Sequence, residues 1–143
     1  MFNSIVVGTD GSDTADRAFA RALEIAGLTG ARLHVVSAYA PAPARVSGAP
    51  TAEAAEWSVG SDFKVEGILD SAISRARSDG VEIEPHAPKG DPADAIVALA
   101  KEIDADLIVL GSRGMQGARR VLGSVPNKVS HRAPCDLLIV QTS

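Results

Sequence analysis

Short apolar segments alternate along the chain with segments whose apolar residues recur at helical spacing, and this alternation constrains the fold more than any other feature. The short segments are near-continuous runs, rich in β-branched residues, at 4–8, 33–39, 81–87, 106–110 and 137–140. Helical spacing is found between them, at 15–26, 65–76, 92–103 and 124–132. The predicted order is βαβαβαβαβ, which is typical of a doubly wound α/β fold with a parallel sheet covered by helices on both faces.

Two segments depart from this regular pattern. The run at 81–87 contains Pro85, which cannot donate a ladder hydrogen bond and therefore favours a strand at the sheet edge. Residues 40–61 are rich in Pro, Ala, Gly and Ser and contain Trp57, so we expect a long loop there. A length of 143 residues without an internal repeat predicts a single domain over 1–143.

Composition argues against several classes of protein. A net charge of −4 gives no basic footprint for a nucleic-acid backbone. No apolar run reaches the length of a membrane span, and the first residues lack the pattern of a signal peptide. Cys135 is the one cysteine, which suits a reducing compartment, so we expect a cytoplasmic protein that binds neither nucleic acid nor membrane.

Two loops carry residues suited to a ligand, and each follows an apolar strand. The first is 8–12, which reads Gly-Thr-Asp-Gly-Ser, and the second is the glycine-rich connector 111–124. Ligands of open parallel sheets bind beyond the carboxyl ends of the strands, where the winding reverses. A strand order of 3-2-1-4-5 would bring the two loops side by side at that point.

The second loop has the parts of a phosphate site. Glycine at 111, 114 and 117 lets the backbone approach a ligand closely, and arginine at 113, 119 and 120 supplies positive charge. Gly123 and Ser124 begin a helix, whose N-terminal N–H groups attract anions. The alternative reading is that the glycines only form turns, that Ser124 only caps the helix and that the arginines are solvated.

The first loop is suited to a different part of the ligand. Neither G-x-x-x-x-G-K-[ST] nor a G-x-G-x-x-G pattern after the first strand is present. Asp10 stands where a phosphate would have to approach, so it suits a ribose hydroxyl or a phosphate bound to Mg²⁺. Its alternative role is to stabilise a turn.

The sequence gives little indication of catalysis. His34, His86 and His131 are scattered without metal-ligand spacing, and we expect each to be structural or exposed. Cys135 precedes a core strand and is expected to be a small buried apolar residue. At most, Mg²⁺ held by Asp10 would permit slow hydrolysis of a bound nucleotide.

The residues at 5–12, 106–114, 123–125 and 133–140 together resemble the universal stress protein family over essentially the whole chain. The resemblance implies a Rossmann-like five-stranded sheet of order 3-2-1-4-5. It also implies a homodimer joined through the last strands, and ATP binding in the subgroup that carries G-x2-G-x9-G-[ST].

The same resemblance assigns roles to particular positions. Thr9 and Asp10 would face the nucleoside and phosphates, and the backbone at Ala38 would contact adenine. Ribose and phosphates would be held by Gly111, Gly114, Gly123, Ser124 and Val125. From the two loops themselves we add Gly8, Arg113 and Gly117.

One departure from the family pattern concerns the ligand. Eight residues lie between Gly114 and Gly123, where the pattern has nine, which would tighten the loop. Besides ATP, we therefore keep AMP and cyclic AMP as candidate ligands of a stress-response regulator. The remaining alternatives are a weak Mg²⁺-dependent ATPase and a nucleotide-free dimeric scaffold, whose partner would bind at the dimer edge or at 40–61.

Overall fold

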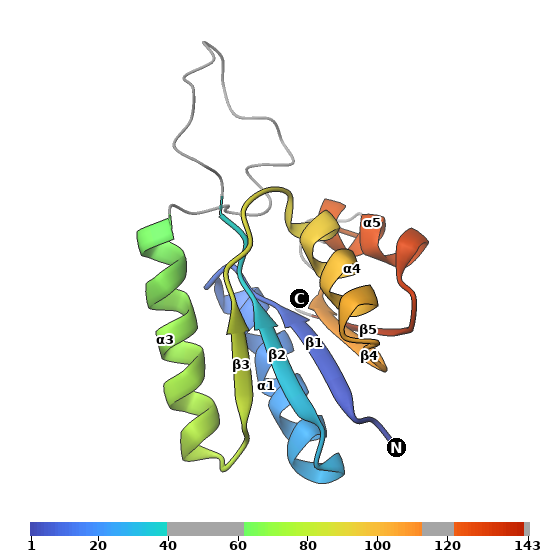
Figure 1. Cartoon of the computed structure of the whole chain (residues 1–143). Helices are drawn as coiled ribbons and strands as arrows, with labels where there is room; N and C mark the ends of the chain where they lie inside the picture. Colours follow the sequence, from blue (N-terminus) through green and yellow to red (C-terminus); the bar gives the residue numbers. More distant parts are fainter. Residues whose placement is uncertain (40–61, 113–121, 142–143) are drawn as a thin grey trace.

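The computed structural model describes residues 1–39, 62–112 and 122–141, and they form a parallel sheet with helices on both faces (Figure 1). The strands are β1 (Ser4–Gly8), β2 (Arg32–Val36), β3 (Ile83–His86), β4 (Leu107–Gly111) and β5 (Asp136–Val140). The helices are α1 (Asp13–Thr29), α3 (Asp62–Ser78), α4 (Pro92–Glu102) and α5 (Ser124–Arg132). The sheet has five strands in the order β3-β2-β1-β4-β5, which confirms the predicted fold class and strand order.

The two faces of the sheet carry separate cores because alternate residues of each strand point to opposite sides. Ile5 and Val7 of β1 pack with residues of α1 and α3 on one face. Val6 packs with Ile96 of α4 and Val129 of α5 on the other. Every strand in the middle of the sheet is therefore buried on both sides, which explains its near-continuous apolar sequence.

Small side chains bring α1 close to the sheet. The residues of α1 buried against it are mostly alanines, namely Ala15, Ala18, Ala22 and Ala26. The side-chain oxygen of Ser12 caps the helix by accepting from the N–H of Ala15 at 3.2 Å. The helix ends at Gly30, whose φ of +76° suits glycine. This alanine-lined contact fits a chain of which only 3% of the residues are aromatic.

Element boundaries differ from the predictions by a few residues. The second strand ends at Val36 rather than at Tyr39, which makes only an isolated bridge to Lys89. Asp106 precedes β4 instead of opening it. Its carboxylate accepts from the N–H groups of Asn3 at 2.6 Å and Ser4 at 2.9 Å, and these bonds lower the pKa of Asp106. Asp106 thus ties the beginning of β1 to the beginning of β4.

The predicted last helix and edge strand are found in the structure, whereas the predicted long loop lies outside the described residues. The helix at 124–132 is confirmed, and β3, with Pro85, lies at a sheet edge. The expected loop at 40–61 with Trp57 lies outside the described residues. Among the residues that are described, no helix is both long and apolar enough to cross a membrane.

Candidate functional site

The loops after β1 and β4 begin side by side at the carboxyl edge of the sheet. β1 and β4 are neighbours, with Val7 opposite Val109, and both strands run in the same direction. From β1 the chain winds out to β2 and β3, then returns to β4 on the other side of β1. The winding therefore reverses between β1 and β4, which is where ligands of this class of sheet bind.

The first loop is buried and held by its own hydrogen bonds. Thr9 and Asp10 are 5% and 3% exposed. The N–H of Thr9 donates to the carbonyl of Val36 at 2.9 Å, which extends the β1–β2 pairing by one step. The Asp10 carboxylate accepts from the N–H of Ser12 at 2.9 Å, so this side chain does stabilise the turn.

Gly11 lets this loop pass close to α3. Its φ is +81°, a left-handed conformation that side chains disfavour. A Cβ at this position would lie 2.9 Å from Cγ1 of Ile68 in α3. The turn from β1 into α1 is therefore fixed both by backbone conformation and by packing.

The N-terminus of α5 lies at the same edge, because α5 connects two parallel strands and begins on the side where β4 ends. Gly123 is the N-cap, with φ −62° and ψ 162°, and it has no side-chain oxygen to cap the first N–H groups. Ser124 is therefore the first helical residue and not the cap. A helix that begins this way presents its positive end to an anion.

Of the remaining predicted nucleotide-binding residues, some lie in the described part of the chain and others do not. Gly111 ends β4, and the N–H of the buried Ser112 donates to the carbonyl of Val140 at 2.9 Å. Ala38 is 2% exposed and follows β2 on the other side of β1. Arg113, Gly114 and Gly117 lie outside the described residues.

A cavity of about 440 Å³ opens between the first loop, α1 and α3. Thr9, Gly11 and Ser12 line it from the loop, and Lys64 and Arg75 line it from α3. The guanidinium of Arg75 forms an ion pair with Asp16 at 2.7 Å. The sequence interpretation missed α3 as part of this edge, because no motif in 62–78 signals that it packs against the first loop.

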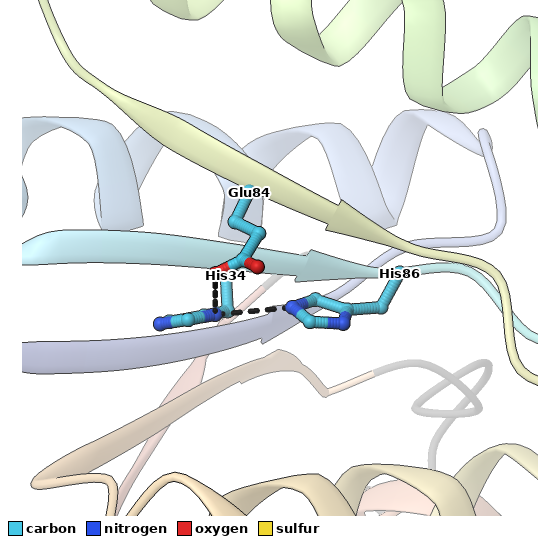
Figure 2. Close-up of side chains that lie close together, drawn as sticks. All are labelled: His34, Glu84 and His86. Carbon is cyan, nitrogen blue, oxygen red and sulfur yellow. Dashed lines mark hydrogen bonds and ion pairs between the residues drawn. The ribbon is translucent and has the colours of Figure 1, made fainter.

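Two of the three histidines lie together in the structure, so the prediction that they are scattered is wrong for these two. His34 of β2 and His86 of β3 meet, with 3.0 Å between Nδ1 of His34 and Nε2 of His86 (Figure 2). The Glu84 carboxylate lies 3.3 Å from the same Nδ1. Burial, and then the charge of His86, lowers the pKa of His34. His131 lies apart, exposed in the last turn of α5.

Cys135 is less buried than the sequence predicts. It is only partly buried, just before β5, where it packs against the core under α4 and α5. Burial, and then the negative charges of Asp136 and Asp106, raises the pKa of its thiol. A thiol in this state is a poor nucleophile.

Comparison with known sequences and structures gives consistent matches along nearly the whole chain. The model of the universal stress protein family matches residues 1–141. A universal stress protein of Mycobacterium tuberculosis is 42% identical over 144 residues, covering 99% of this chain and 98% of that protein. One from Bacillus subtilis is 35% identical over 148 residues, covering 99% and 100%.

Two solved structures with bound nucleotides have the same fold. A universal stress protein in complex with cyclic AMP is 39% identical, with a TM-score of 0.78 and coverage of 99% of both chains. The universal stress protein of Archaeoglobus fulgidus in complex with dAMP is 31% identical, with a TM-score of 0.70 and coverage of 96% of both chains.

Proposed function

Because the chain belongs to the universal stress protein family, we propose that it binds an adenine nucleotide between the first loop and the N-terminus of α5. The observation that carries the proposal is the glycine N-cap of α5 at the point where the winding of the sheet reverses. The ligands of two structural neighbours, cyclic AMP and dAMP, support the choice of adenine.

The proposed nucleotide spans three strands of the sheet. Its phosphate lies at Gly123, Ser124 and Val125, and its ribose lies beside Thr9 and Asp10. Its base lies against the backbone at Ala38, which β2 holds next to the first loop through the bond from Thr9 to Val36. We keep Gly8, Gly111, Arg113, Gly114 and Gly117 as further contacts.

Among adenine nucleotides we propose ATP first, with AMP and cyclic AMP as alternatives. ATP would bring Mg²⁺, which commonly takes one carboxylate together with phosphate oxygens. Asp10 fits that role, because the bond that its carboxylate accepts from Ser12 fixes the position of the side chain. We therefore propose a stress-response regulator that acts through nucleotide binding rather than through rapid turnover.

Calorimetry with ATP, ADP, AMP and cyclic AMP tests this function. We expect one nucleotide per chain for at least one of the four, at sub-millimolar dissociation constants. Removing Mg²⁺ with a chelator is expected to weaken ATP binding and to leave cyclic AMP unaffected. If none of the four gives heat or thermal stabilisation at millimolar concentration, the proposed function is wrong.

We also propose a homodimer joined through β5, which is an edge strand. Leu137, Leu138, Ile139 and Val140 are all only partly buried, whereas the apolar side chains of β1, β2 and β4 are buried. An apolar edge of this kind invites pairing with a second copy. The opposite edge, β3, is shorter and contains Pro85, which disfavours pairing there.

Ile139→Asp tests the dimer, because it places a charge on the edge strand outside both core clusters. We expect light scattering to give a dimer for the wild type and a monomer for the variant at micromolar concentration. Leu28→Asp is the control, since Leu28 is 81% exposed on α1 and should leave the dimer intact. A wild-type monomer would contradict the proposal.

A further inference from the structure

Three side chains with metal-binding atoms converge on one face of the sheet where β2 pairs with β3. The register places His34 opposite Glu84 and Val36 opposite His86. Because residues two apart on a strand point to the same side, Glu84 and His86 project to the face that His34 occupies. That is also the face on which α4 packs, since His34 lies opposite Val6 of β1, which contacts Ile96.

The distances match those between the ligands of one small ion. His34 Nδ1 lies 3.0 Å from His86 Nε2 and 3.3 Å from the Glu84 carboxylate, and all three ligand atoms lie within 4.8 Å of one another. Two ligand atoms bound at 2.0–2.1 Å to a tetrahedral Zn²⁺ lie about 3.3 Å apart. Figure 2 shows Glu84 and His86 both directed at His34.

A proton on Nδ1 of His34 cannot give good hydrogen bonds to both neighbours of that atom. Each ring nitrogen of a neutral histidine either donates one hydrogen or accepts with one lone pair. If Nδ1 of His34 donates to Glu84, it has no lone pair for His86; if it accepts from His86, it directs a lone pair at a carboxylate. A cation placed among the three atoms interacts favourably with all of them at once.

We propose that His34, Glu84 and His86 form a binding site for a divalent transition metal, with Zn²⁺ as the preferred ion. Two imidazoles and one carboxylate suit Zn²⁺, whereas Mg²⁺ and Ca²⁺ favour sites made of oxygen alone. Neutral imidazole is the form of histidine that binds a metal ion. Three protein ligands leave one coordination position for water.

The surroundings allow an ion to enter. The side chain of His34 is 6% exposed, but that of Glu84 is 48% exposed. His86 lines a groove of about 850 Å³ between the end of β3 and α4. Arg32 approaches Glu84 at 3.8 Å, yet its shorter ion pair is with Glu82 at 2.7 Å, so Glu84 can turn to a metal while Arg32 stays paired.

The site shares no residue with the proposed nucleotide site, although the carbonyl of His86 accepts from the N–H of Ser37, the residue before Ala38. It would fasten β3, an edge strand, to β2 in the interior of the sheet. Bound metal should therefore raise the melting temperature, by about 5 °C or more at a hundredfold excess over the dissociation constant.

The test is titration of the tag-free full chain with Zn²⁺ against a chromophoric chelator. We expect one Zn²⁺ per chain, and Co²⁺ in its place should give the visible absorption of a four-coordinate ion. Glu84→Gln and His86→Ala should each weaken binding by about 100-fold or more, because even outer-shell partners of a metal typically contribute about 10–100-fold. Both positions are exposed enough for the variants to fold, unlike the buried His34.

Two controls distinguish this site from incidental binding. His131→Ala and Cys135→Ser remove metal-binding atoms elsewhere and should leave the Zn²⁺ affinity unchanged. Nucleotide affinity should be the same in His86→Ala and the wild type. Absence of stoichiometric Zn²⁺ binding, or equal affinity of His86→Ala and the wild type, would overturn the metal site without touching the proposed nucleotide function.

Discussion

Gly123→Asp is expected to weaken nucleotide binding strongly while the chain still folds. The backbone of Gly123 is already in the extended conformation of an N-cap, and aspartate is a favoured residue there. Its carboxylate would accept from the N–H of Val125, because Pro126 at the next position has none. The same charge would repel a phosphate, so we expect affinity to fall by roughly 100-fold, or about 2.7 kcal/mol, the size of one or two charge-assisted hydrogen bonds.

Calorimetry with whichever nucleotide binds the wild type measures this loss, and circular dichroism checks the fold. Gly27→Asp is the matched control, because it adds the same charge at an exposed position near the C-terminal end of α1, away from the first loop. Since Gly123 is buried, Ser124→Asp serves as a second variant that adds the charge at a position already carrying a side chain. Unchanged affinity in both folded variants would place the phosphate elsewhere.

Local signals in the sequence were sufficient for the fold. Ser12 and Asp91 precede helices and do cap them, and Gly30 ends α1 with a positive φ. The 124–132 helix is predicted with its observed bounds, because Gly123 and Ser124 indicate where it begins. The sequence does not show where a strand ends, since an extended segment such as 37–39 can follow a strand without pairing continuously.

The candidate site could be predicted only where its residues are near in sequence. The loop at 8–12 and the start of α5 are each recognisable within a few residues. His34 and His86 are separated by 52 positions, and only the β2–β3 register brings them into contact. A shift of one residue in that register would turn Glu84 and His86 to the opposite face. Lys64 and Arg75 line the cavity beside the first loop only because α3 packs there, and this packing leaves no signature in the sequence.

Ile108→Ala is expected to cause the largest loss of stability. Ile108 is fully buried in β4, next to Val6 of β1 and Leu137 of β5, in the core that contains Val125 and Val129 of α5. Removing three carbons from such a position leaves a cavity and typically costs about 2–5 kcal/mol. For a domain of this size, that loss corresponds to a fall in melting temperature of roughly 5–20 °C.

Leu28→Ala is the matched control for that change, because it removes the same number of carbons from a side chain that is 81% exposed. Its effect should stay within about 0.5 kcal/mol. Saturating nucleotide, at a hundredfold excess over its dissociation constant, should return about 2.7 kcal/mol to Ile108→Ala if α5 still presents its N-terminus. A loss no larger than that of Leu28→Ala would mean that the core under α5 is not packed as described. If Ile108→Ala loses the expected stability but nucleotide does not restore any of it, the binding site depends on this core. The cavity would then have displaced α5 from the phosphate.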